Sequence, residues 1–175
     1  MNVQASPKTG RGPTSAVIGF IVDAMQRSGV PAADSAKIAE LMLEADLIGA
    51  DAHGIFRLPQ YVQRLKLGST NSRPNISVTR SAPATALVDG DNGMGHLVVA
   101  KTAETAIVLA RENGVAWVGC RNSGHAGAAG VCAALPLKAD MIGIYSAVAN
   151  ANHMPLAGGA QPLLGTNPLA IAIPA

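Results

Sequence analysis

Residues 114–130 read GVAWVGCRNSGHAGAAG, an apolar run followed by a polar loop in which one histidine stands among several glycines. The apolar part, VAWVGC at 115–120, is typical of a buried strand. The part at 124–135 predicts a short helix that stops before Pro136. Such a junction is either a phosphate cradle at the start of a helix or a loop that carries a proton-transferring His125. In both cases the stretch predicts a strand-to-helix unit of an α/β domain.

The segments on the N-terminal side of this stretch predict a helical start. Residues 14–28, 31–49 and 58–68 carry apolar side chains at helical spacing, and each segment ends close to a glycine. The spacing changes to alternation at 76–78, and ATALV at 84–88 is expected to pair with that segment across a turn. The chain therefore begins with helices and changes to strands near residue 76.

The later segments alternate between the two kinds of element. Residues 95–113 have helical spacing, whereas MIGIYSAV at 141–148 and PLAIAIP at 168–174 have the pattern of strands. Strands alternating with helices after a helical start predict an α/β fold. We expect three regions, namely a disordered tail at 1–13, a helical region at 14–72 and an α/β cofactor-side region at 73–175. Because the chain stops directly after an apolar strand, we expect the α/β region to be incomplete.

The composition argues against several classes of protein. Apolar residues make up 49% of the 175 residues and charged ones 14%, which is an ordinary globular composition. A formal net charge of +2 and 3% aromatic residues argue against nucleic-acid binding, and no apolar run reaches the roughly 20 residues of a membrane span. Residues 1–13 lack the apolar segment of a signal peptide. Since Cys120 and Cys132 are expected to be buried thiols, we predict a cytoplasmic protein with neither a nucleic-acid nor a membrane partner.

A group of chemically useful residues lies in DAHGIFRLPQYVQRL. Arg57 and Tyr61 follow His53 by four and eight residues, so an unbroken helix would place all three on one face. Pro59 makes an unbroken helix doubtful, but a turn would still bring His53 and Arg57 together. Guanidinium matches a carboxylate and imidazole titrates near neutral pH, which suits a small acid whose hydroxyl must lose a proton. The alternative is a surface arginine beside a helix-terminal histidine.

His125 has a stronger case, because side chains at a strand-to-helix junction project from the carboxyl edge of a sheet. The start of the following helix would favour the neutral imidazole that a general base needs, and Asn122 or Ser123 could fix its tautomer. The alternative is a loop that only caps the helix. No pair among the four histidines has metal-binding spacing, so we expect no metal site.

Two other stretches contain glycines next to polar residues. Gly93 and Gly95 follow a strand, but Val98 occupies the third glycine position of a dinucleotide-binding fingerprint, so a tight turn into a helix explains them better. The neighbouring His96, like His153, is expected to be a local hydrogen-bonding residue.

The stretch GGAQPLLGTNPLAIAIP near the end is the second of these. Its glycines at 158, 159 and 165 would let the backbone approach a ligand, while Thr166 and Asn167 supply hydrogen bonds just before a strand. A structural turn alone would also explain the glycines.

Four motifs, taken in order, resemble the malate/L-lactate dehydrogenase family of NAD(P)-dependent oxidoreductases, which is not built on a Rossmann fold. They are ADLIGADAHGIFRLPQYVQRL, GVAWVGCRNSGHAGAAG, MIGIYSAVANANHMPLAGG and LGTNPLAIAIP, and the resemblance extends from about residue 15 to the end. It implies that family's α/β fold. It also implies hydride transfer between NAD or NADP and a small 2-hydroxy or 2-oxo acid, carried out by a homodimer.

The resemblance implies residue roles as well. It assigns acid/base roles to His53 and His125, of which we favour His125 as the group at the substrate hydroxyl. It places Arg57 near the substrate carboxylate and Tyr61 on the same substrate side. The cofactor contacts that it implies are Ala149, Asn150, Gly158, Gly159, Thr166 and Asn167.

The chain departs from the family pattern at three points. Ala52 stands where a serine commonly precedes the first histidine, and AVANAN replaces a TNS-like group after the MIGI strand. The chain also stops before the aspartate-containing segment that completes the nicotinamide site in the longer family members. The alternative function is therefore a non-catalytic fragment that binds a small carboxylate or a partner subunit.

Overall fold

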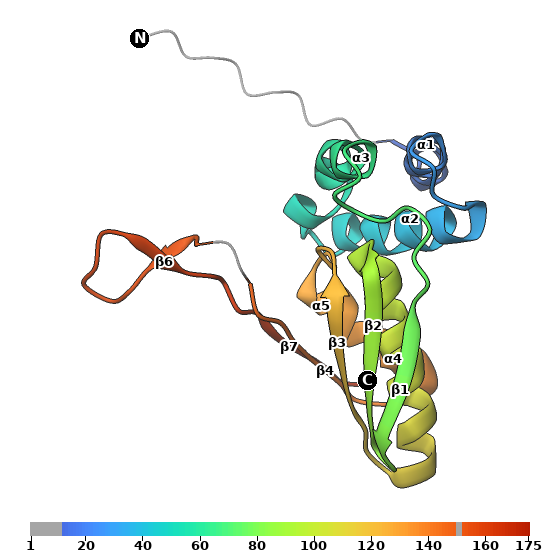
Figure 1. Cartoon of the computed structure of the whole chain (residues 1–175), viewed down its shortest axis with the longest axis vertical. Helices are drawn as coiled ribbons and strands as arrows, with labels where there is room; N and C mark the ends of the chain where they lie inside the picture. Colours follow the sequence, from blue (N-terminus) through green and yellow to red (C-terminus); the bar gives the residue numbers. More distant parts are fainter. Residues whose placement is uncertain (1–11, 150–151) are drawn as a thin grey trace, which may run out of the picture.

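The fold places a layer of helices across one end of a small sheet, and a long β ribbon reaches away from this body (Figure 1). The computed structural model describes residues 12–149 and 152–175. Residues 1–11 of the expected tail, and Asn150, lie outside the described residues. Within the described part of the chain, no helix combines the length and apolar character that crossing a bilayer requires.

Three helices form the end layer. They are α1 (Thr14–Arg27), α2 (Ala32–Leu47) and α3 (Leu58–Lys66). All three follow the segments whose helical spacing predicted them. Among the side chains that their apolar faces enclose are Ile21, Met25, Ile38, Met42 and Tyr61. The same core includes Met94 and Leu97 from the start of the next helix, so burial of apolar surface fixes the layer to the end of the sheet.

The sheet has three strands in the order β1–β2–β3, and one helix covers one of its faces (Figure 1). The elements are β1 (Ser77–Ala82), β2 (Thr85–Gly93), α4 (Gly95–Asn113) and β3 (Trp117–Ser123). β1 pairs antiparallel with β2, whereas β3 pairs parallel with β2, so β2, α4 and β3 form a strand–helix–strand unit. The carboxyl ends of β2 and β3 therefore meet under the helical layer.

Two expectations about this sheet are wrong. The strand expected at 115–120 begins at Trp117 and is not buried, since Trp117 is 71% exposed. Cys120 in the same strand is also exposed, whereas Cys132 is buried as predicted. The physical reason is that α4 packs on only one face of the sheet, and within the described residues the other face of β3 is open.

After β3 the chain forms a short helix and the first strand of the ribbon. The elements are α5 (Ala129–Ala134), the 3-10 turn η3 (Leu135–Ala139), β4 (Gly143–Ser146) and β7 (Leu169–Ala172). β4 and β7 pair antiparallel and pack against α5. The helix expected from residue 124 thus begins five residues later, and the chain continues through Pro136 as a 3-10 turn instead of stopping before it.

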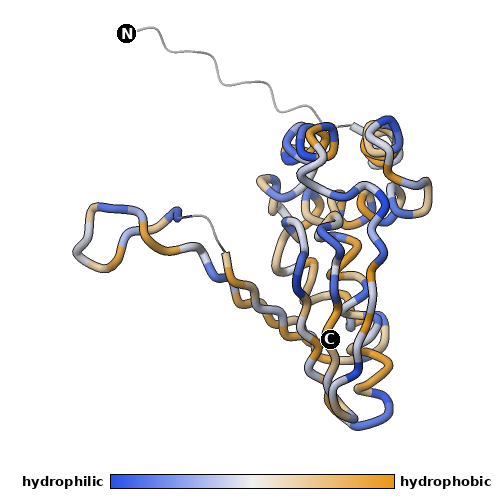
Figure 2. Tube along the Cα trace, in the orientation of Figure 1, coloured by the Kyte–Doolittle hydropathy of each residue, from blue (hydrophilic) through white to orange (hydrophobic). Residues whose placement is uncertain are grey.

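Between β4 and β7 lies a hairpin that the sequence did not predict. Its strands are β5 (Met154–Pro155) and β6 (Pro162–Leu164), which pair antiparallel. The ribbon is apolar over much of its length (Figure 2). Its exposed apolar side chains include Ile142, Ile144, Leu169, Ile171 and Ile173. The α/β class is confirmed, whereas the boundary expected between residues 72 and 73 stays a prediction.

Candidate active site

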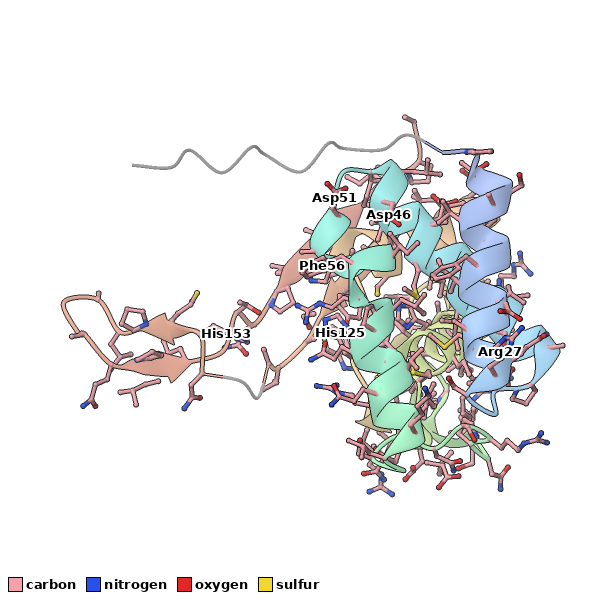
Figure 3. All side chains as sticks on the ribbon, turned by 90° about the horizontal axis from the view of Figure 1, so that it is seen from above. Arg27, Asp46, Asp51, Phe56, His125 and His153 are labelled. Carbon is pink, nitrogen blue, oxygen red and sulfur yellow. The ribbon has the colours of Figure 1, made fainter. Side chains whose placement is uncertain are left out.

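A tyrosine of α3 meets the histidine of the glycine-rich loop beneath the helical layer. Tyr61 is 2% exposed, and its hydroxyl oxygen lies 2.7 Å from Nδ1 of His125. His125 is half-buried in the loop that joins β3 to α5, and Figure 3 shows it beside the ribbon of α3. The fold therefore joins two side chains that are 64 positions apart along the chain.

The loop that carries this histidine is held against the start of α4. Gly124 donates its backbone N–H to the carbonyl of Gly93 over 3.0 Å, and Sγ of Cys132 lies 3.6 Å from the carbonyl of Ala126. A Cβ at Gly95 would collide with the backbone of the loop. The glycine pair therefore permits close packing of α4 on this loop, in agreement with the tight turn that we expected there.

The segment that carries His53 forms two consecutive 3-10 turns, η1 (Asp51–His53) and η2 (Ile55–Arg57), so α3 does not extend back to the histidine. The carboxylate of Asp46 in α2 accepts the first backbone N–H of η2 over 2.9 Å. Gly54 lies so close to this carboxylate that a Cβ would clash with it. Asp46 and Gly54 together hold the turn against α2.

This turn places His53 and Arg57 close to the loop histidine. The rings of His53 and His125 are stacked, with centroids 5.5 Å apart and planes at 18°. Arg57 donates from Nε to the carbonyl of Ala52 over 2.8 Å and from Nη1 to Oε1 of Gln60 over 2.9 Å. These two contacts hold the guanidinium, and its remaining N–H groups have no partner within the described residues and can donate to a ligand.

The electrostatic environment keeps both rings neutral at neutral pH. Burial, followed by the positive charges of Arg57, His53 and Arg64, lowers the pKa of His125 to about 4. Burial, followed by the charge of Arg57, also lowers the pKa of His53. We expected a helix start to favour the neutral His125, and this explanation is wrong because α5 begins only at residue 129. No carboxylate is among the groups that shift His125, so the surroundings of this ring favour anions.

Two groups lie within hydrogen-bond distance of Nδ1 of His125. The backbone N–H of Gly127, 3.3 Å away, can only donate and favours the neutral ring with its proton on Nε2, whereas the Tyr61 hydroxyl can donate to Nδ1 or accept from it and allows the proton on either nitrogen. Asn122 and Ser123 do not fix the tautomer as we expected. Asn122 donates to Asp89 over 3.0 Å, and Ser123 donates to a backbone carbonyl.

The structure adds His96, whose place beside the site the sequence did not reveal. His96 is 1% exposed, and its ring meets that of Tyr61 edge-on, with centroids 5.4 Å apart and planes at 85°. Neither ring nitrogen has a hydrogen-bond partner in the described part of the chain, so the expectation of a local hydrogen-bonding residue is wrong. Burial lowers the pKa of His96 to about 3. The apolar neighbours in MGHLVVA were the available signal for its burial.

The residues predicted to contact a cofactor fall into two groups. Between the β4–β7 pair and the outer hairpin of the ribbon, Oδ1 of Asn167 accepts the backbone N–H of Ala149 over 2.9 Å, and Thr166 beside it is exposed. Asn167 has a positive φ of 40°, which the side-chain hydrogen bond helps to hold. The structure thus joins the two chain segments that lead from β4 into the hairpin of β5 and β6 and back to β7, while Asn150 is not described.

The second group, Gly158 and Gly159, is exposed in the loop between β5 and β6. Figure 3 shows the hairpin, marked by His153, standing away from His125. The structure therefore does not bring these glycines to the histidines. Among the described residues, no group of three or more His, Cys, Asp or Glu side chains is arranged to hold a metal ion.

Known proteins match this chain over almost all of its length. The sequence profile of the malate/L-lactate dehydrogenase family matches residues 13–175. The chain is 43% identical over 153 residues to the L-sulfolactate dehydrogenase of Methanocaldococcus jannaschii, which covers 87% of this chain and 44% of the relative. The solved structure of the malate dehydrogenase of Pyrococcus horikoshii superposes with a TM-score of 0.89 at 38% identity, over 94% of this chain and 47% of that chain. This chain therefore spans somewhat less than half the length of the proteins it matches.

Proposed function

The chain belongs to the malate/L-lactate dehydrogenase family, and we propose that it carries the substrate-binding and proton-transfer residues of an NAD(P)-dependent oxidoreductase that acts on small 2-hydroxy or 2-oxo acids. The observation that carries this proposal is the cluster of Tyr61, His125 and His53 beside Arg57. It combines a titratable ring with an anion-binding group in one place, which is what proton transfer next to a carboxylate requires.

Arg57 would bind the carboxylate of the substrate. Its guanidinium keeps N–H groups that its contacts with Ala52 and Gln60 leave free, and a planar guanidinium matches a carboxylate with two parallel hydrogen bonds. A carboxylate held there leaves the neighbouring substrate oxygen next to the stacked histidines. The turn fixed by Asp46 therefore serves to orient the substrate.

His125 would move the proton at the substrate oxygen. Its Nδ1 is engaged by Tyr61 and Gly127, which leaves Nε2 as the atom for the substrate. Reduction of a 2-oxo acid needs Nε2 of the protonated ring to give its proton to the oxygen, which leaves the proton of the neutral ring on Nδ1. Oxidation of a 2-hydroxy acid needs this same neutral form, in which Nδ1–H donates to the Tyr61 hydroxyl and Nε2 is free to take the proton. A tyrosine hydroxyl can donate to Nδ1 or accept from it, so Tyr61 supports both states of the ring. The stacked His53 would assist by hydrogen bonding to the substrate.

Part of the cofactor site fits a nicotinamide dinucleotide. The contact between Ala149 and Asn167 presents backbone and amide groups, the hydroxyl of Thr166 is exposed beside it, and Gly165 leaves no room for a Cβ. These groups suit the amide and ribose of a nicotinamide nucleotide. Bound NAD or NADP would supply or accept the hydride at the substrate carbon.

A second candidate function is the binding of a small carboxylate or a partner subunit without hydride transfer. The observation in its favour is that the N–H groups left free on Arg57 can bind a carboxylate whether or not a cofactor is present. The exposed apolar ribbon also supports a homodimer as part of our proposal. Two free cysteines are consistent with the cytoplasmic location that we propose.

Fluorescence titration with NADH and NADPH, followed by assays with 2-oxo acids, separates the two candidates. Saturable binding and turnover by the 175-residue chain are expected for the oxidoreductase. His125→Ala should then reduce turnover by about 10²–10⁴-fold, while the exposed His153→Ala, as a matched control, should not. Turnover that His125→Ala leaves unchanged would refute the role of this histidine. Carboxylate binding without NAD(P)H binding would favour the second candidate.

A further inference from the structure

A second arginine lies on the same side of α3 as Arg57 and has no assigned role. Arg64 follows Arg57 by seven residues, and seven residues of an α-helix turn by roughly 700°, which is about 20° short of two full turns. The backbone of Arg57 already has helical dihedrals, with φ of −81° and ψ of −13°, so the helical count applies from that residue. Arg57 and Arg64 therefore form a stripe along α3, about 10 Å apart along its axis.

Tyr61 connects this stripe to the proton-transfer cluster. Tyr61 lies between the two arginines in sequence and points into the core, where its hydroxyl meets His125. The positive charges of Arg57 and Arg64 both act on Tyr61 and on His125. The contact between Tyr61 and His125 therefore lies within the range of both positive charges.

The two arginines also differ from most cations of the protein. Within residues 12–149 and 152–175, six basic side chains pair with a carboxylate. Arg57 and Arg64 have no acidic partner there, and the side chain of Arg64 is exposed and makes no hydrogen bond there. Because Arg64 has no acidic partner there, its guanidinium is available for a second anionic group of a ligand whose first carboxylate binds Arg57.

We propose that Arg64 binds a second anionic group of the substrate, so that the site selects 2-hydroxy acids with a carboxylate or sulfonate at the far end over those with an uncharged end. This inference rests on the proposed function, because it takes Arg57 as the contact for the first carboxylate. Arginine side chains are long enough for two positions on one helix stripe to converge on a single small ligand. Arg64 is thus a specificity-determining residue of the same site.

The test compares L-malate with L-lactate, which lacks the second carboxylate, on the 175-residue chain. The NMR signal of the His125 ring reports binding of either acid without any turnover. We expect the chain to bind malate more tightly than lactate. Arg64→Gln should weaken malate binding by about fivefold, the effect of losing one exposed ion pair, and leave lactate binding unchanged. Lys66→Gln, which removes an exposed positive charge from another side of α3, is the matched control and should change neither.

The outcomes separate this inference from the function on which it rests. If Arg64→Gln leaves the ratio of the malate and lactate affinities unchanged while Arg57→Gln abolishes binding of both, the role of Arg64 is refuted and the proposed site stands. If the unmodified chain binds neither acid, or if Arg57→Gln has no effect, the proposed carboxylate site and the role of Arg64 both fail. Restoration of malate binding by Arg64→Lys would confirm that the charge is what matters.

Discussion

The buried His96 makes a sharp prediction about acid stability. Its ring is 1% exposed and its pKa is lowered from 6.5 to about 3, mainly by burial. In the unfolded chain the same ring takes up a proton near pH 6.5, whereas in the folded protein it stays neutral. Between these two pH values the unfolded state binds more protons, so stability falls as the pH falls.

The size of this effect depends on how far the pH lies below the pKa of His96 in the unfolded chain. At about pH 4.5 the ring is about two pH units below its unfolded value, and each unit is worth about 1.4 kcal/mol, so His96 alone removes roughly 3 kcal/mol of unfolding free energy. This is a large share of the total unfolding free energy of an ordinary domain, which is about 5–15 kcal/mol. Replacing His96 by Phe, which is of similar size and does not titrate, should remove this share of the acid sensitivity.

Urea unfolding at about pH 7.5 and about pH 4.5 measures the effect. The loss of unfolding free energy between the two pH values should be smaller in His96→Phe than in the unmodified chain, by roughly 3 kcal/mol. His96→Leu provides a second apolar replacement in case the aromatic ring does not pack. His153→Asn controls for the substitution of an exposed histidine. An equal loss in His96→Phe, His96→Leu and the unmodified chain would refute the argument, because the burial of His96 would then not be linked to folding.

Three further predictions concern other parts of the site and sheet. Arg57→Gln removes the positive charge that acts most strongly on His125, so the pKa of His125 should rise. NMR titration of the His125 ring measures this pKa, and an unchanged value would show that the two side chains are independent. Gly127 has a φ of +87°, and a Cβ added there would lie 3.0 Å from Nε2 of the buried His96. Gly127→Ala should therefore lower the free energy of unfolding by about 1–3 kcal/mol, and an unchanged midpoint of urea unfolding would contradict the described loop. In the folded chain a thiol reagent should label the exposed Cys120 and spare the buried Cys132 until urea is added; equal labelling of both would contradict the described burial.

The sequence predicted well those features that depend on neighbouring residues. The three helices of the end layer and the pairing of β1 with β2 follow from spacing and from turn residues within short segments. The proximity of His53 and Arg57 also depends on one local turn. The burial of β3 could not be predicted in this way, because it depends on what covers the second face of the sheet. Apolar composition alone therefore gave the wrong environment for Trp117 and Cys120.

The chemistry of the site depended on contacts between distant segments. Sequence spacing suggested that Asn122 or Ser123 would orient His125, but the partner is Tyr61 from a helix 64 positions earlier. Nothing in the residues around His125 specifies that contact. The same holds for His96, whose environment is set by Tyr61 and by the close approach of Gly127. Residue type and spacing can thus identify candidate groups, whereas their protonation states follow from packing.

Under the proposed function, the charge of Arg57 has two effects that follow one another. Before a substrate binds, it adds to the burial that lowers the pKa of His125 and keeps the ring neutral. A substrate carboxylate at Arg57 offsets this positive charge, so the pKa of His125 rises when the anion is bound. Protonation of the ring and binding of an anionic 2-oxo acid are then linked, and each favours the other. The protonated ring that reduction needs is therefore favoured when the carboxylate is in place.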